Sequence, residues 1–324
     1  MSVLQQTTLF LSAPAKINLG LRVTGRRLDG YHTIETVMQK IGLCDELELR
    51  RGGKGIRLRC PNGTAPEDET NLVYRAADLF LRTMADRCAG PLSGVDIVLR
   101  KRIPVAAGLG GGSSDAAATL KGMQALTAVR CSEKELAAMG LRLGADVPFF
   151  LGEAPAARAT GIGEILTPVA PLTNYTVVVV NPGFPVSTQW VYQTFALTVG
   201  KNKSKKKCFK KNTNNSDEKN RCCNEFPQSA VLRNDLESVT VVRYPEIGRL
   251  KNELRTHGAE MALMSGSGPS VFGLFARRED AESSYNVLRK RIKFTFMVAP
   301  LTRSEQGNVL TNANQLMDWG VVKR

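Results

Sequence analysis

The chain has 324 residues, of which 43% are hydrophobic and 23% are charged, and this length and composition predict a folded protein of two domains. No apolar run approaches the ~20 residues that a membrane helix needs, so we expect no membrane-spanning segment. The net charge of +14 suggests a nucleic-acid-binding protein, but half of this excess lies between residues 201 and 224.

The first half of the chain predicts strands mixed with helices. Apolar residues alternate with polar ones between residues 9 and 23, a period of two that puts Lys16 and Asn18 on one face of a strand. A turn at 28–30 then leads directly to Tyr31 and His32. By the same patterns we expect strand segments within 45–60 and over 95–100, and helices over 71–84, 114–128 and 132–143, the last opening with a Ser-x-x-Glu capping box.

In the second half, prolines near 167–174 mark a domain boundary. We place the N-terminal domain at 1–168, the C-terminal domain at 169–305 and a tail at 306–324. The expected strands are 175–180, 259–264, 270–275 and 294–300, and the expected helices are 188–197, 244–256 and 279–291. Strands mixed with helices in both halves indicate an α+β fold, and not a helical bundle or a β-sandwich.

The basic segment at 201–224 has eight Lys and one Arg against one Asp and one Glu, and almost no apolar residues. Such a stretch cannot bury enough surface to offset the entropy that ordering costs. We therefore predict a disordered, solvated insertion. The alternative is an element that binds a polyanion.

The seven cysteines are scattered and none forms a C-x-x-C pair, so the usual zinc and thiol-redox signatures are missing. The first residues lack the basic start and the long apolar centre of a secretory signal, and they do not form a convincing transit peptide. We therefore expect a cytoplasmic protein, with a plastid-type organelle as the alternative if the source has one.

The most informative segment is PVAAGLGGGSSDAAAT at 104–119, between a predicted strand and an Ala-rich helix. Glycine lets the backbone approach a ligand closely, and the unpaired amides at the start of the following helix can bind phosphate oxygens. Ser113 and Ser114 can add hydroxyl donors or approach a cation bound to the phosphates. The segment therefore predicts a site for nucleotide phosphates.

Two commoner nucleotide loops are excluded here. No Lys follows the glycines, as GxxxxGK[ST] requires, and the position five after Gly108 is Ser113, where GxGxxG requires glycine. The alternative is a tight turn that needs glycine, but four glycines within five positions followed by two serines exceed what a turn requires.

The loop resembles the phosphate loop of the GHMP kinases (galacto-, homoserine, mevalonate and phosphomevalonate kinases). Four further segments resemble the same family: PAKINLGL at 14–21, DGYH at 29–32, LGADVPFF at 143–150 and SGSGPSVF at 265–272. Five motifs in consistent order over roughly residues 10–300 are far more specific than any one of them. The resemblance implies an N-terminal nucleotide-binding α/β domain and a C-terminal ferredoxin-like domain, with the active site between them.

The combination is most similar to the branch of the family that acts on methylerythritol linked to cytidine diphosphate, in the non-mevalonate route to isoprenoid precursors. It implies transfer of the γ-phosphoryl group of ATP, with Mg²⁺, to the 2-hydroxyl of the methylerythritol unit. Asp146 matches the family's base, which accepts the proton of the alcohol, and Lys16 matches the lysine that orients the hydroxyl near the γ-phosphate. The alternatives are a helix cap or a structural ion pair for Asp146, and an exposed strand position for Lys16.

The resemblance also implies binding residues. Tyr31 and His32 match the aromatic platform and the histidine that hold a cytosine ring, and Tyr192 is our choice for a second aromatic wall, with Phe184 and Trp190 as alternatives. The predicted substrate contacts are Asn18, Tyr31, His32, Tyr192, Ser265 and Gly266. The predicted ATP contacts are Asn71, Lys101, Pro104, Val105, Ala106, Ala107, Gly108, Leu109, Gly110, Gly111, Gly112, Ser113 and Ser114.

Some features depart from the family pattern. The basic insertion is foreign to it, Asp115 follows the two serines where Asn is equally acceptable, and no carboxylate can be assigned to magnesium. One rival function is a mevalonate or homoserine kinase, against which the DGYH segment argues. Another is a nucleic-acid-binding protein that uses the Lys-rich segment, which has no aromatic residue besides Phe209. We therefore expect a small-molecule substrate as the partner, and neither nucleic acid nor a membrane, while the oligomeric state stays open.

Overall fold

The computed structural model of the chain describes residues 8–61, 63–87, 94–203 and 233–303. The predicted basic insertion therefore lies outside the described residues apart from its first three, and the predicted tail lies wholly outside them. Within the described ranges, no helix is long and apolar enough to span a bilayer.

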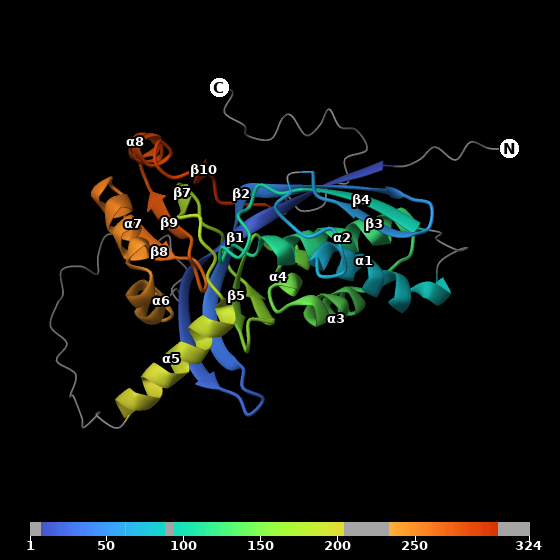
Figure 1. Cartoon of the computed structure of the whole chain (residues 1–324), viewed down its shortest axis with the longest axis horizontal. Coiled ribbons are helices and arrows are strands. Elements are labelled where there is room, and N and C mark those ends of the chain that lie inside the picture. The colour runs from blue at the N-terminus through green and yellow to red at the C-terminus, as the bar shows by residue number, and fades with distance from the viewer. Residues whose placement is uncertain (1–7, 62, 88–93, 204–232, 304–324) are drawn as a thin grey trace.

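The strands before residue 169 form one sheet, in the order β3-β4-β2-β5-β6, with β1 paired along β2. These strands are β1 (Thr8–Arg26), β2 (His32–Arg51), β3 (Gly55–Arg59), β4 (Gly94–Arg100), β5 (Ala156–Thr160) and β6 (Ile165–Pro168). The antiparallel β1–β2 pair runs from the upper right of Figure 1 to its lower centre, and so reaches both halves of the molecule.

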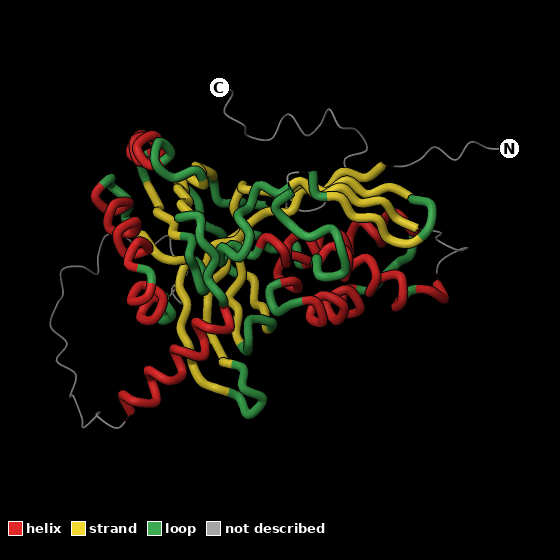
Figure 2. Tube along the Cα trace, viewed as in Figure 1, coloured by secondary structure: helices red, strands yellow, loops and turns green. Residues whose placement is uncertain are grey.

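Helices of the same half pack together on one face of this sheet (Figure 2). They are α1 (Leu72–Thr83), α2 (Gly111–Thr127), α3 (Glu133–Leu143) and α4 (Val147–Leu151), with a short 3₁₀ turn at Ala85–Arg87. The helix α2 is buried along most of its length and packs against β1 and β2, because its Ala-rich sequence allows a close approach to the sheet.

The strands after residue 169 form a second, antiparallel sheet in the order β10-β7-β9-β8. The elements are β7 (Thr176–Asn181), α5 (Thr188–Lys203), α6 (Glu237–Arg243), α7 (Pro245–Thr256), β8 (Met261–Met264), β9 (Val271–Phe275), α8 (Arg278–Leu288) and β10 (Phe294–Val298). Taken in chain order, this is the ferredoxin-like βαββαβ arrangement that the resemblance implies, with α5, α6 and α7 all lying between β7 and β8.

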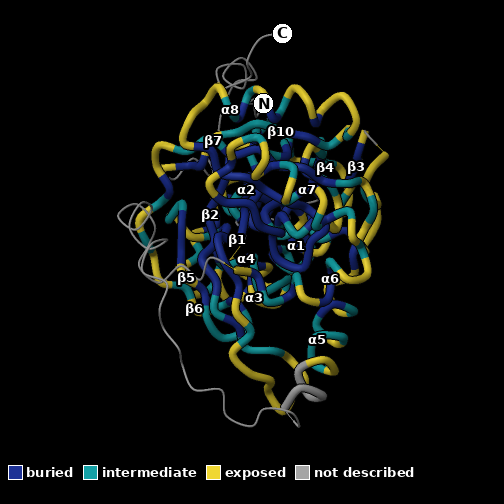
Figure 3. The backbone as a smooth tube through the Cα atoms, turned by 90° about the vertical axis from the view of Figure 1, so that its left-hand side faces the viewer, coloured by how far each residue is buried: buried dark blue, intermediate teal, exposed yellow. Residues whose placement is uncertain are grey.

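The two sheets share a core. Apolar residues of β1 and β2, among them Ile17 and Ile41, pack with Val177, Leu263 and Phe272 of the second sheet. Residues 13–21 of β1 are consequently buried on both faces, and Figure 3 shows β1, β2 and α2 as the buried centre. Side chains on β1 can therefore reach elements of both halves, and this arrangement positions the site.

Most predicted elements are confirmed, with shifted ends. The predicted helix 114–128 begins at Gly111, so the last glycines of the loop already belong to the helix. The predicted helix 188–197 continues to Lys203, into the first residues of the basic segment. The first half of β2 and the strands β5 and β6 were not predicted, because polar residues interrupt the apolar ones in the first half of β2, β5 is mostly alanine, and β6 has only four residues.

Candidate active site at the start of helix α2

The start of α2 offers backbone amides without helical partners. The N-cap is Gly110, which has no side chain to accept a hydrogen bond from the first-turn N–H groups. The first hydrogen bond of the helix runs from the Ser114 amide to the Gly110 carbonyl at 2.9 Å, so the amides of residues 111–113 have no acceptor within the helix. These amides lie at the positive end of the helix dipole, which suits phosphate oxygens.

Two glycines let this loop approach its neighbours. Gly108 has a φ of +77°, and a Cβ placed on it would lie 2.1 Å from the carbonyl oxygen of Ser265. Gly110 has a φ of +71°, and its Cβ would meet Phe150 at 2.9 Å and Cγ of Lys16 at 3.0 Å. The glycines are therefore required by a left-handed backbone and by contacts with distant segments, which a simple tight turn would not need.

Lys16 and Asp146 meet beside this helix start. Nζ of Lys16 lies 3.5 Å from Oδ2 of Asp146, and the side-chain exposures are 5% for the lysine and 34% for the aspartate. The exposed-strand alternative for Lys16 is therefore wrong. Asp146 does occupy the N-cap position of α4, but its side chain makes no capping hydrogen bond, so its carboxylate is open to solvent and to a ligand.

A buried network orients Lys16. Its ammonium donates a hydrogen bond of 2.6 Å to Oδ1 of Asn18, whose amide nitrogen donates to Oγ1 of Thr36 at 2.9 Å. The Ser265 hydroxyl donates to the Gly108 carbonyl at 2.9 Å and accepts a hydrogen bond of 3.3 Å from the backbone N–H of Asn18. The glycine turn at 265–268 thus lies against both the phosphate loop and the lysine.

A second buried network lies under the first turn of α2. The Lys101 ammonium is paired with Oδ2 of Asp115 at 2.7 Å and with Asp45, whose other oxygen accepts from the amide of Ile103 at 2.9 Å. We call Asp45, Lys101 and Asp115 the buried triad. Burial and then the nearby Asp45 carboxylate raise the pKa of Asp115 to about 8, against the opposing effect of Lys101. The triad joins both ends of the phosphate loop to β2.

The two serines of the loop face different surroundings. A Cβ on Gly144 would lie 3.7 Å from Oγ of Ser113, so the Ser113 hydroxyl lies on the side of the segment that leads to Asp146. Oγ of Ser114 and Oδ1 of Asp115 are buried and have no hydrogen-bond partner. Unpaired buried oxygens are costly unless something binds them, and hydroxyl and carboxylate oxygens are ligands that Mg²⁺ accepts. The described ranges contain no cluster of three or more His, Cys, Asp or Glu residues suited to a metal ion.

The predicted aromatic site forms around Tyr192. Its ring stacks on the ring of His32, with centroids 5.3 Å apart and planes inclined by 26°. Burial and then the negative charge of Asp146 raise the pKa of Tyr192, so this aromatic pair lies close to the predicted base. Burial and the Arg26 guanidinium lower the pKa of His32, and a neutral imidazole offers one donor and one acceptor. Tyr31 is 61% exposed.

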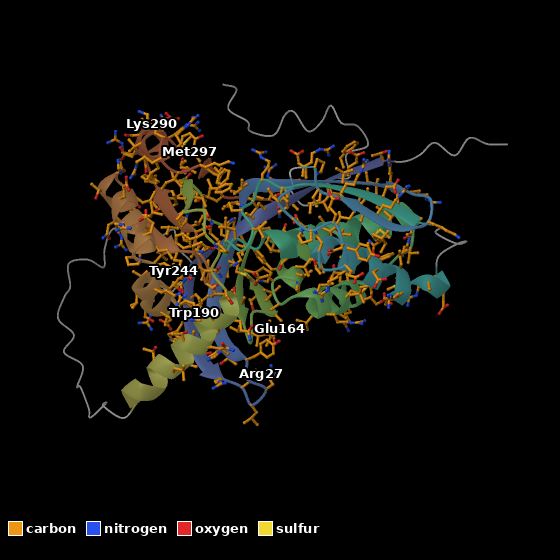
Figure 4. All side chains as sticks on the ribbon, in the orientation of Figure 1. Arg27, Glu164, Trp190, Tyr244, Lys290 and Met297 are labelled. Atoms are coloured by element: carbon orange, nitrogen blue, oxygen red, sulfur yellow. The ribbon has the colours of Figure 1, made fainter. Side chains whose placement is uncertain are left out.

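The alternatives to Tyr192 lie elsewhere. Phe184 stacks on Tyr244 with ring centroids 5.0 Å apart, and Trp190 meets the same ring edge-on at 6.1 Å. Figure 4 shows Trp190 and Tyr244 together on the side of α5 and α6, whereas Arg27 lies at the tip of the β1–β2 hairpin. The structure therefore favours Tyr192 over both alternatives as the aromatic neighbour of His32.

The remaining residues that were predicted to bind ATP differ in whether they are free to contact a ligand. Asn71 caps α1, accepting from the Val73 amide at 2.9 Å and donating to the Pro66 carbonyl at 2.7 Å, so its side chain is already occupied. Val105 is exposed, and Ala107 accepts a backbone hydrogen bond from Ser270. Ala107 thus links the phosphate loop to the second half of the chain, whereas the Val105 side chain faces solvent.

Sequence reasoning missed several residues of the site. Thr36 and Asp45 lie on β2, and Asn234 donates to the carbonyls of Met264 and Gly266 at 2.9 and 2.6 Å, fixing the glycine turn. None of these three residues lies within one of the five family motifs. The only sequence signal for Asp45 is its place at the start of the alternating residues 46–50.

Comparisons with known proteins identify the family of the chain. The model of the GHMP kinase N-terminal domain matches residues 71–153, and that of the GHMP kinase C-terminal domain matches residues 210–293. The chain therefore belongs to the GHMP kinase family.

More particular relatives carry one name. The chain is 45% identical to a 4-diphosphocytidyl-2-C-methyl-D-erythritol kinase of Geobacter sulfurreducens, over 90% of this chain and 98% of that protein. It is 43% identical to a kinase of the same name from Syntrophus aciditrophicus, over 87% and 95% of the two chains. A crystal structure of 4-(cytidine 5'-diphospho)-2C-methyl-D-erythritol kinase matches with a TM-score of 0.69 and 35% identity, over 90% of this chain and 98% of that one. A mevalonate kinase structure shares the fold, with a TM-score of 0.64 at 14% identity.

Proposed function

We propose that this chain transfers the γ-phosphoryl group of ATP to the 2-hydroxyl of 4-diphosphocytidyl-2-C-methyl-D-erythritol. The observation that carries the proposal is the placement of a lysine–aspartate pair beside a helix start with unpaired amides, in a chain 45% identical to a kinase of that name over nearly its full length. The reaction places the chain in the non-mevalonate supply of isoprenoid precursors. The mevalonate and homoserine alternatives share the fold with this chain only at low identity.

In this proposal Asp146 accepts the proton of the 2-hydroxyl. A free alcohol is a poor nucleophile at neutral pH, and a positioned carboxylate removes its proton as the new O–P bond forms. The partial exposure of Asp146 leaves room for the alcohol, whereas the ammonium of Lys16 is held almost fully buried by Asn18. Lys16 then orients the hydroxyl and stabilises negative charge on the transferred phosphoryl group.

The nucleotide would lie over the start of α2. The amides of residues 111–113 are free to donate to phosphate oxygens, and the turn at 265–268 closes the opposite side of the loop. Asn71 and Lys101 have engaged side chains, so any contact they make with ATP would come mainly from their backbone groups.

Magnesium fits the polar atoms near the phosphates. Ser113 lies toward Asp146, and the unpartnered oxygens of Ser114 and Asp115 are in the same turn of helix. The Ser113 hydroxyl would hold the ion together with the nucleotide's own phosphate oxygens, as kinases that bind Mg²⁺ through few protein ligands do. Bound there, the ion would neutralise phosphate charge.

The cytosine ring would bind at Tyr31, His32 and Tyr192. The His32 and Tyr192 rings are already stacked with centroids 5.3 Å apart, which leaves no room for a base between these two. The base would therefore stack on an outer face of this pair, with the exposed Tyr31 as its other neighbour, while the neutral imidazole of His32 recognises its polar edge.

The test is the release of ADP by the purified full chain with a panel of alcohols. We expect turnover with the cytidylated methylerythritol and at most traces with mevalonate or homoserine. Asp146→Asn should lower kcat by roughly 10²–10⁴-fold, the usual contribution of an acid–base residue. Turnover of mevalonate in preference to the cytidylated substrate would refute the substrate, and near-normal kcat in Asp146→Asn would refute the base.

A further inference from the structure

The short helix α4 is held at both ends by lysines that face each other across two strands. Lys16 of β1 and Lys40 of β2 are partners in the antiparallel register, so their side chains leave the same face of the sheet. Lys16 reaches Asp146, which starts α4, and Nζ of Lys40 donates a hydrogen bond of 2.8 Å to the carbonyl of Gly152, which ends it.

Lys40 is an unusual residue to find at this depth. It is 1% exposed and is the only charged residue among the largest fully buried side chains of the described ranges. Its ammonium lies 5.0 Å from the ring centroid of Phe149 in α4, and its backbone is fixed by the Pro155 carbonyl and the Leu301 amide. Burying an ammonium is costly, and the catalytic roles proposed above give it no task.

We propose that Lys40 is a positioning residue for the reaction: by binding the carboxyl end of α4, it fixes the orientation of the helix and so the place of Asp146 beside Lys16. The inference rests on the proposed function, because it gives Asp146 the role of base.

Three features of α4 support this role. The helix has only five residues, so it has little stability of its own, and a shift at one end moves the other. Its start lacks a side-chain cap, so Asp146 is not held there by the usual means. A cation at the carboxyl end binds the unpaired carbonyls and favours the helix dipole, and Lys121 adds a longer contact of 3.5 Å to the Phe150 carbonyl.

The charge of Lys40 makes the role measurable. Burial, and to a smaller extent the positive charge of Lys121, lowers the pKa of Lys40 to about 7, while the negative charge of Glu153 opposes this shift. The charged groups around it are thus Lys121 on α2, Glu153 after α4 and Lys16 across the strand pair. As the pH rises through about 7, Lys40 loses its charge, its hold on the Gly152 carbonyl weakens, and we expect kcat to decline.

The experiment compares Lys40→Met and Lys40→Arg with wild type in the full chain, using ADP release at saturating ATP and cytidylated substrate. We expect Lys40→Met to lower kcat by about 10–100-fold, since small misplacement of a catalytic group has effects of this size. The KM values for both substrates should stay within threefold. Lys40→Arg should keep most of the activity and lose the decline of kcat above pH 7, because a guanidinium stays charged.

A matched control is Lys251→Met, which removes a mostly buried lysine that pairs with Glu237. Lys251 lies on α7, in the other half of the molecule from α4 (Figure 1), so this variant should leave kcat within twofold. A folded Lys40→Met protein with kcat within threefold of wild type, or with raised KM values instead, would overturn the inference. If Lys40→Met does not fold, the comparison of wild type with Lys40→Arg tests the inference instead. Identical profiles of kcat against pH between pH 6 and 8.5 for these two proteins would also overturn the inference. Should Asp146→Asn keep its activity, the assignment of the base fails first, which separates the two proposals.

Discussion

The contact between the phosphate loop and the second glycine turn can be tested by adding one methyl group, in Gly108→Ala. The left-handed backbone at a φ of +77° costs an alanine roughly 1–2 kcal/mol. In addition, the new Cβ would lie 2.1 Å from the Ser265 carbonyl oxygen, a distance that forces the two segments apart. Overpacking of this kind typically costs about 1–3 kcal/mol, so we expect a total loss of roughly 2–5 kcal/mol in the free energy of unfolding.

A control isolates the steric part of this cost. Gly55 has a φ of +69°, and a Cβ on it would meet nothing within 4 Å, so Gly55→Ala carries the backbone cost alone, about 1–2 kcal/mol. Urea unfolding of both variants measures the difference. Because separation of the turn from the loop also withdraws Ser265 from Asn18, we expect kcat/KM for ATP to fall at least about tenfold in Gly108→Ala and to stay within twofold in Gly55→Ala. Equal destabilisation of the two variants, with unchanged kinetics, would refute the proposed contact.

Three further results are expected. First, the folded state holds the pKa of Asp115 at about 8, above its ordinary value of 3.8, so its contribution to stability is present below pH 4 and is lost as the pH rises through 8. The free energy of unfolding measured in urea should therefore decline from pH 5 to 8, and it should decline less in Asp115→Asn. An equal decline in both proteins would contradict the buried, protonated carboxyl. Second, His32→Ala should raise KM for the cytidylated substrate by about tenfold or more and spare KM for ATP, whereas His257→Ala, at the end of α7, should change neither; an ATP-only defect would count against the base-binding role. Third, deletion of 204–224 should leave kcat within about threefold, because α5 leads the chain away from the site before this segment (Figure 1); loss of turnover with intact folding would show that the segment takes part in the reaction.

Local sequence determined the elements whose signals are short-range. The strand at β1, the capping box of Ser132 and Glu135, and the glycine-rich start of α2 each depend on neighbours a few residues away, and the structure has all three, although α2 begins three residues earlier than predicted. The order of the five motifs was also enough to identify the family, since this order does not depend on how the chain folds.

Other features were decided by the tertiary structure alone. The first half of β2 was missed because Gln39 and Lys40 are buried there, and a polar residue can be buried only where distant carbonyls accept its hydrogen bonds. The choice of Tyr192 over Trp190 depended on which side of α5 faces His32, which the sequence leaves open.

The sequence by itself determined which chemical groups this protein carries: an amide-rich glycine loop, a lysine, a carboxylate and an aromatic pair. Only the tertiary structure decided how they are held, with Ser265 of the second half against Asn18, Asp45 against Lys101, and Lys40 against the end of α4. The physical reason is that these contacts join residues about 50 to 250 positions apart, whose meeting depends on the packing of two sheets around a shared core.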